Sequence, residues 1–160
     1  MLPERSRLER FDEAIDDATR AIAVEPGSIR LLYHRGGLLA MAERYDDAIA
    51  DLTRAIEKYQ GNVRPYIIRG NCYRSLNMFD MALADYSRVI ELAPTIAEPL
   101  FQRATLRFEM KKFQEAADDL TRAIELDPSP RFHIKRAECW TKLEKLDRAA
   151  ADRKAAESLK

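Results

Sequence analysis

The sequence has few of the residue types that most catalytic and metal sites use. It contains two histidines, two cysteines and five glycines in 160 residues. His34 and His133 lie far apart in the sequence, so neither metal-ligand spacing nor a catalytic triad is visible. Only Gly36 and Gly37 are adjacent, and no glycine-rich loop for a phosphate group is present. We therefore expect a protein that is not an enzyme and that holds no metal or cofactor.

The chain also lacks any apolar run close to the roughly 20 residues that a membrane-spanning helix needs. Its 27 basic and 27 acidic residues give a formal net charge of zero, which favours neither nucleic acid nor an anionic membrane as a partner. Two cysteines are too few for a disulfide framework, so we expect reduced thiols. The first ten residues lack the apolar core of a secretory signal. These features predict a cytoplasmic protein.

What the sequence does contain is a segment that recurs every 33 or 34 residues. Its most complete copy, FQEAADDLTRAIELDP, occupies residues 113–128, and related copies begin at Phe11, Tyr45, Phe79 and Leu146. Small or apolar residues follow in these copies at the spacing i, i+3, i+4, i+7, which predicts an amphipathic helix. We name these segments the B helices. A period of this length indicates an array in which each repeat packs on its neighbours.

A second set of predicted helices, the A helices, alternates with the B helices. Their predicted ranges are 29–42, 63–76, 97–110 and 130–143. Each contains an arginine followed by a small residue, such as Gly36 or Gly70, which we expect to face an early alanine of the next B helix, such as Ala48, at a short interhelical distance. Brief turns join each A helix to its B helix and imply antiparallel pairs. Gly61 and Asn62 are predicted to end the B helix before them in a left-handed conformation.

These repeated columns resemble the tetratricopeptide repeat (TPR) family. In one repeat the resemblance rests on Gly70, Tyr73, Ala82, Tyr86 and Pro94, and in the next on Ala104, Phe113, Ala116, Leu120, Ala123 and Pro128. It covers essentially the whole chain as a single array: a half repeat at 1–28, full repeats at 29–62, 63–96 and 97–129, and a last repeat at 130–160. The resemblance implies an all-α, right-handed superhelical solenoid of about nine helices. It also implies a concave groove, lined by A helices, that holds peptide segments of other proteins.

Two departures from the family pattern concern the ends of the array. The first repeat lacks most of its A helix, and Pro3 stands where that helix would run. The last repeat has no capping helix after it, although repeat arrays normally need polar ends for solubility. We therefore expect either a fragment of a longer protein or a module whose open ends pair with another copy.

Charged residues also recur with the period. Aspartates stand at Asp17, Asp51, Asp85, Asp119 and Asp152, and the first four precede an arginine of the same helix by three residues. That spacing is worth about 0.2–0.5 kcal/mol for each pair on an exposed helix. We predict that the A-helix arginines have a structural role and bond the aspartate of the preceding B helix, in the pairs Asp17–Arg35, Asp51–Arg69, Asp85–Arg103 and Asp119–Arg136. A row of arginines that binds a ligand is the alternative.

The A-helix face opposite the small residues is predicted to line the groove. Its candidate peptide-binding residues are Arg30, Tyr33, His34, Arg64, Ile67, Asn71, Arg74, Phe101, Gln102, Arg131, Ile134 and Lys135. This face carries more basic than acidic side chains, and Tyr33, Ile67, Phe101 and Ile134 form an apolar column along it. Such a groove suits an extended peptide with acidic and apolar side chains, or a C-terminal carboxylate.

Some TPR domains bind the C-terminal carboxylates of heat-shock chaperones with a clamp of Lys, Asn, Asn, Lys and Arg. Asn71 matches the first Asn of that clamp, but Gln102 only resembles the second and Ile67 replaces the leading Lys. Arg131 and Lys135 resemble the closing basic pair with their identities exchanged. Chaperone-tail binding is therefore a minor alternative.

The sequence as a whole favours a non-enzymatic scaffold that binds a peptide or a partner protein. A self-assembling module that stacks through its end repeats is an alternative. Binding of single-stranded RNA is a further alternative, but the zero net charge weighs against it. We expect neither nucleic acid nor a membrane as a partner.

Overall fold

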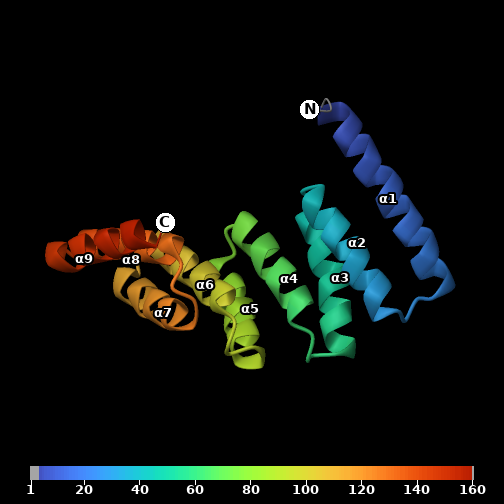
Figure 1. The fold of residues 1–160 in the computed structure, drawn as a ribbon. Coiled ribbons are helices and arrows are strands. Elements are labelled where there is room, and N and C mark those ends of the chain that lie inside the picture. Colours follow the sequence, from blue (N-terminus) through green and yellow to red (C-terminus); the bar gives the residue numbers. More distant parts are fainter. Residues whose placement is uncertain (1–3, 160) are drawn as a thin grey trace. The chain divides into compact units, whose positions relative to one another are not determined.

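A computed structural model describes residues 4–159, with side chains from Glu9 onward. These residues form nine α-helices and no strand (Figure 1). The helices are α1 (Glu4–Val24), α2 (Ile29–Met41), α3 (Tyr45–Lys58), α4 (Val63–Ser75), α5 (Phe79–Leu92), α6 (Ala97–Glu109), α7 (Phe113–Leu126), α8 (Pro130–Lys142) and α9 (Leu146–Ser158). The expected all-α repeat fold is confirmed, with α2, α4, α6 and α8 as the A helices. Pro3 lies outside the described residues.

The chain forms two compact units, of which the first ends at Asp85 and the second begins at Tyr86, inside α5. In the N-terminal unit α2 packs against α1 and α3, and α3 packs against α4. In the C-terminal unit α7 packs against α6 and α8, and α8 packs against α9. Consecutive A helices also touch within each unit, α2 with α4 and α6 with α8. Each unit therefore has one face made by two neighbouring A helices.

The first helix is longer than the sequence pattern predicts. The repeated segment starts at Phe11, but α1 begins at Glu4 and runs without a break into the B helix. Residues 4–10 contain neither proline nor glycine, and most of them are good helix formers. They therefore extend the B helix instead of forming part of an A helix.

Small residues line the contact between paired A and B helices in each unit, as predicted. Gly36 and Ala48 are buried, and a Cβ atom on Gly36 would lie 2.8 Å from Cγ of Leu52. Ala104 and Ala116 occupy the same columns in the C-terminal unit and have no exposed surface. A larger side chain in either column would push the paired helices apart.

The turns from A to B helices place a residue other than glycine in the left-handed conformation. These residues are Glu43, Asn77, Lys111 and Glu144, with φ angles of 60°, 59°, 61° and 58°. In the first turn the amide of Glu43 donates to the carbonyl of Ala40 (3.1 Å), and the amide of Arg44 donates to the carbonyl of Leu39 (2.9 Å). This pair of bonds is the Schellman motif.

The predicted left-handed helix end at Gly61 is wrong, because no described glycine has a positive φ angle. Asn62 instead caps the following helix α4, and its side-chain oxygen accepts from the amide of Arg64 at 3.1 Å. The Gly61-Asn62 pair therefore marks the start of an A helix rather than the end of a B helix.

Candidate functional site

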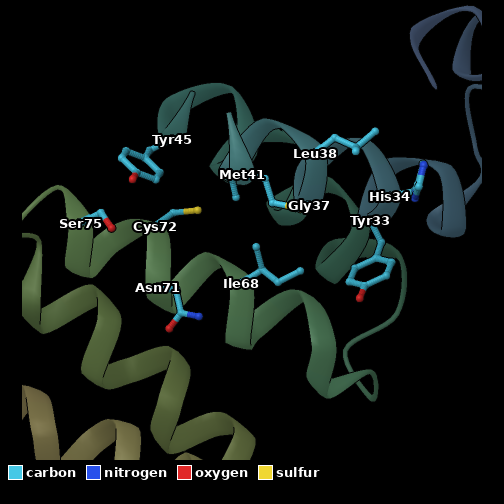
Figure 2. Close-up of a pocket in the computed structure, with 11 residues that line it drawn as sticks. Tyr33, His34, Gly37, Leu38, Met41, Tyr45, Ile68, Asn71, Cys72 and Ser75 are labelled. Carbon is cyan, nitrogen blue, oxygen red and sulfur yellow. The ribbon is translucent and has the colours of Figure 1, made fainter. Parts of the chain in front are cut away.

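A cavity of about 540 Å³ lies between α2 and α4 in the N-terminal unit (Figure 2). We name it the α2–α4 hollow. Its lining residues are Tyr33, His34, Gly37, Leu38, Ala40, Met41, Tyr45, Ile68, Asn71, Cys72 and Ser75. Most of these side chains are apolar, with a few polar groups among them. A mostly apolar hollow of this size is typical of a ligand-binding site.

Gly37 explains why the hollow lies at this place. The corresponding position of the other A helices carries Asn71, Thr105 or Glu138. A Cβ atom added to Gly37 would meet only Cδ1 of Ile68, at the ordinary contact distance of 3.8 Å. The missing side chain therefore leaves open space between α2 and α4. Figure 2 shows Gly37 facing Ile68 across this space.

The structure brings three of the predicted groove residues together in the hollow, namely Tyr33, His34 and Asn71. Ile67 does not line it, because the next residue, Ile68, faces α2 instead. Arg74 lies one turn beyond Asn71 and is half-buried. Arg30 and Arg64 are exposed in the first turns of α2 and α4.

Two lining residues could not be identified from the repeat pattern. Tyr45 is the first residue of the B helix α3, and Cys72 lies in the A helix α4. Cys72 is 99% buried, and its side chain forms part of the hollow wall. Burial raises the pKa of the Cys72 thiol to about 11, so the group is neutral at pH 7 and is a poor nucleophile. Only the three-dimensional structure shows that Tyr45 and Cys72 line the hollow.

In the C-terminal unit, Arg131 is held by other side chains of the protein. Its Nη2 atom donates to Oε2 of Glu98. Its guanidinium carbon also lies 4.7 Å from the ring centre of Phe132 and 5.1 Å from that of Phe101. The side-chain amide of Gln102 donates to Oε1 of the same Glu98 at 2.9 Å. A ligand at this place would have to compete with these contacts.

Lys135 is paired in the same unit. Its Nζ donates to Oε2 of Glu138 at 2.7 Å and lies 4.0 Å from the ring centre of Phe108. The neighbouring Ile134 remains 47% exposed. The two basic residues predicted for this part of the groove, Arg131 and Lys135, are therefore paired with acidic side chains of the protein, whereas Ile134 remains accessible.

The A-helix arginines form buried ion pairs, but with partners other than the predicted ones. Arg35 donates from Nε and Nη2 to both carboxylate oxygens of Asp51 (2.6 and 2.8 Å), in the B helix that follows. Its Nη1 donates to the hydroxyl of Thr19 (3.1 Å), in the B helix that precedes. We name this three-helix arrangement an arginine clamp.

The clamp recurs at every A helix. The other three sets are Thr53–Arg69–Asp85, Ser87–Arg103–Asp119 and Thr121–Arg136–Asp152. The predicted pairs with the preceding aspartate are therefore wrong. The reason is geometric, because residues two apart, such as Asp17 and Thr19, point to different sides of a helix. Asp17 instead forms an exposed pair with Arg20.

The last clamp holds its aspartate with additional donors. Asp152 accepts from Nδ1 of His133 (2.9 Å) and from Nε1 of Trp140 (3.1 Å) besides Arg136. Burial alone raises the pKa of Asp152, but the hydrogen bonds and charges of Arg136 and His133 outweigh burial and lower the pKa below its usual value. His133 therefore has a structural partner in the buried core of α8 and α9.

Other kinds of site receive no support from the described residues. Within residues 9–159, no three or more His, Cys, Asp or Glu side chains are placed to hold a metal ion. In the part of the chain that the structure describes, every helix is too short or too polar to cross a membrane.

Comparison with known proteins identifies the repeats. Two family models, both described as tetratricopeptide repeat, match residues 63–96 and residues 3–63 and 101–158. No curated protein sequence matches the chain. A crystal structure of MamA has a TM-score of 0.89 and 18% identity, and covers 97% of this chain and 91% of its own. MamA 41-end from Desulfovibrio magneticus RS-1 has a TM-score of 0.85 and 17% identity, with 97% and 92% covered.

Identities this low establish a common fold and nothing more about function. The family models, in contrast, match most of the sequence directly. They agree with the helix pairs, the small-residue columns and the 34-residue period. The chain belongs to the tetratricopeptide repeat family.

Proposed function

We propose that this protein is a scaffold that binds a peptide segment of a partner protein in the α2–α4 hollow. Tetratricopeptide repeats support protein partners as the general class. The single observation that supports the place is the apolar hollow of about 540 Å³ that Gly37 leaves between two A helices. The C-terminal unit supports a ligand less well, because Arg131 and Lys135 are already paired within the chain.

The chemistry of the hollow fits an extended peptide with one large apolar side chain. Tyr33, Met41, Tyr45 and Ile68 offer apolar surface around the space left by Gly37. Burying a Leu, Met or Phe side chain against such surface contributes about 1.5–3 kcal/mol. Asn71 places a side-chain amide in the wall, and an amide can both donate to and accept from a peptide group. The hollow would thus bind the apolar side chain of the peptide, and Asn71 would form hydrogen bonds with the peptide backbone beside it.

The test fills the hollow and leaves the rest of the surface unchanged. An array of capped peptides, each with one apolar residue in a serine and glycine background, is screened against the wild type. Peptides that bind are then titrated by fluorescence anisotropy against the variant Gly37→Met. We expect at least a tenfold loss of affinity, since the new side chain occupies the space of the ligand.

The matched control is Thr105→Met, which adds a methionine at the same column of α6 in the C-terminal unit. It should bind the peptides as the wild type does. Equal affinity of wild type and Gly37→Met, with both folded by circular dichroism, would show that the hollow is not the binding site.

A further inference from the structure

Two arginines stand at one end of the α2–α4 hollow. Arg30 and Arg64 occupy the same column in the first turns of α2 and α4, and both side chains are exposed. Among residues 9–159, neither guanidinium group has a hydrogen-bond or ion-pair partner. Two like charges on neighbouring helices repel each other unless an anion lies between them.

The C-terminal unit shows that side chains in this column reach one another. Its two residues at the equivalent positions are Glu98 on α6 and Arg131 on α8, and they form an ion pair across the two helices. In the N-terminal unit Arg30 occupies the position of the glutamate. The pair therefore consists of two basic side chains and contains no carboxylate. A carboxylate supplied by a ligand would lie between Arg30 and Arg64 as that of Glu98 lies beside Arg131.

The distance between this arginine pair and the hollow can be derived from helix geometry. Arg30 precedes Gly37 by seven residues, which corresponds to about 10 Å along a helix at about 1.5 Å per residue. An extended peptide rises about 3.3 Å per residue. An acidic side chain held by the arginines would therefore stand about three residues from the side chain held in the hollow.

We propose that the N-terminal unit recognises a two-point motif, with an apolar side chain in the hollow and an acidic side chain about three residues away between Arg30 and Arg64. The inference rests on the proposed peptide site and specifies its ligand. The apolar residue supplies contact area, and the acid fixes the register of the peptide. Charge-assisted hydrogen bonds to guanidinium groups are among the stronger polar contacts, and they favour carboxylates over amides of the same shape.

The experiment uses capped nine-residue peptides with a leucine anchor in a serine background. Glutamate is placed one, three or six residues from the leucine, on either side, and each peptide has a glutamine counterpart. Affinities are measured by NMR titration of the whole chain. We expect glutamate at a distance of three, on one side, to bind about tenfold more tightly than its glutamine counterpart, and the gain to fall as salt is added.

The variant Arg30→Glu recreates the Glu98–Arg131 arrangement of the C-terminal unit, so it has a precedent within this fold. It should abolish the gain from glutamate and leave the affinity of the glutamine peptides unchanged. Arg122→Glu, on the exposed surface of α7, makes the same change in charge and should keep the gain.

The outcomes separate this inference from the proposed function. Leucine peptides that bind equally well with glutamate and glutamine, or a gain that survives in Arg30→Glu, would overturn the inference alone. Absence of binding by every leucine peptide and by every peptide of the apolar array, in protein that remains folded, would overturn the proposed function and this inference with it.

Discussion

Two adjacent glycines of α2 have opposite surroundings. Gly36 faces the B helix, where a Cβ atom would lie 2.8 Å from Cγ of Leu52, a side chain with no exposed surface. Gly37 faces the hollow, where a Cβ atom meets Ile68 at 3.8 Å. Alanine gains the same helix propensity, about 1 kcal/mol, at either site. We expect Gly37→Ala to raise the free energy of unfolding by about that amount.

Gly36→Ala should be less stable than Gly37→Ala by about 1–3 kcal/mol, because α3 must move to admit the methyl group. Urea denaturation of the two single variants measures this difference directly, since the propensity gain cancels between them. Equal stability of the two variants would contradict the close contact between α2 and α3.

The arginine clamps predict a large effect at Arg35. Asp51 is 3% exposed and receives two hydrogen bonds from Arg35. Arg35→Ala leaves that buried carboxylate without its partner, and we expect a loss of about 3–5 kcal/mol in the free energy of unfolding. Arg44, which pairs with Asp47 on the surface, is the control, and Arg44→Ala should cost less than about 1 kcal/mol. Similar losses in the two variants would argue against the clamp.

The lowered pKa of Asp152 predicts a dependence of stability on pH. A carboxyl group whose folded pKa lies below its unfolded value of about 3.9 stabilises the fold fully above that value. This contribution is lost as the pH falls through the folded pKa. The stability difference between wild type and Asp152→Asn should therefore shrink below about pH 4. Chemical denaturation of both proteins at intervals from pH 6 to pH 3 measures this stability difference. A difference that stays constant over this range would disagree with the structure.

At the scale of elements, the turns after the A helices retain strain that glycine would relieve. Lys111 has a φ angle of 61° at the left-handed position between α6 and α7. A left-handed residue with a side chain costs about 1–2 kcal/mol, part of which is offset by the greater freedom of glycine in the unfolded chain. Lys111→Gly should therefore raise the melting temperature.

Lys112 offers a neighbouring control for this turn. Its φ angle is −84°, which any residue adopts without strain, so Lys112→Gly should lower the melting temperature slightly. Opposite changes in melting temperature for the two variants would come from the left-handed turn and not from the removal of a lysine in general.

The helices could be predicted from sequence because their signal repeats. The apolar spacing, the small columns and the short turns each occur several times, so one irregular copy does not hide the pattern. The extension of α1 back to Glu4 was missed because it lies outside the repeated segment. The clamp partners were also missed, since the columns of Asp and Thr recur equally and only the direction of each side chain distinguishes them.

The hollow illustrates the limit of prediction for the site. Tyr33, His34 and Asn71 could be placed on the correct face by counting along the A helices. The cavity itself depends on a side chain that is absent, at Gly37, and on Tyr45 from a B helix. The pairing of Arg131 with Glu98 is likewise a matter of which side chains meet between helices. The repeat pattern shows which columns vary from repeat to repeat. It does not show which of the variable side chains form ion pairs with one another.

At the scale of the whole molecule, the outer face of α9 bears on self-assembly. The column that holds the fully buried Leu52 and Leu120 in earlier B helices holds the exposed Arg153 in α9, whose Nη2 atom donates to the hydroxyl of Thr141 in α8 at 3.0 Å. Glu157 likewise takes the column of the buried Ile56. A polar face of this kind disfavours stacking of another repeat by apolar contact.

We therefore expect sedimentation of the wild type to show no association through α9. The double variant Arg153→Leu and Glu157→Ile restores the apolar pattern of the earlier B helices and should promote association in a concentration-dependent manner. A double variant that sediments like the wild type at every concentration would show that this face does not control assembly.

The arginine clamps also predict the order in which the helices unfold. Helix α3 is joined to the helix before it by Asp51 and to the helix after it by Thr53, and α7 is joined in the same way by Asp119 and Thr121. Detaching either helix breaks two clamps at once. Among the side chains that the structure describes, α1 takes part in one clamp, through Thr19, and α9 in one clamp, through Asp152. Unfolding should therefore begin at α1 and α9. Amide hydrogens of α3 and α7 should then exchange with solvent more slowly than those of α1 and α9.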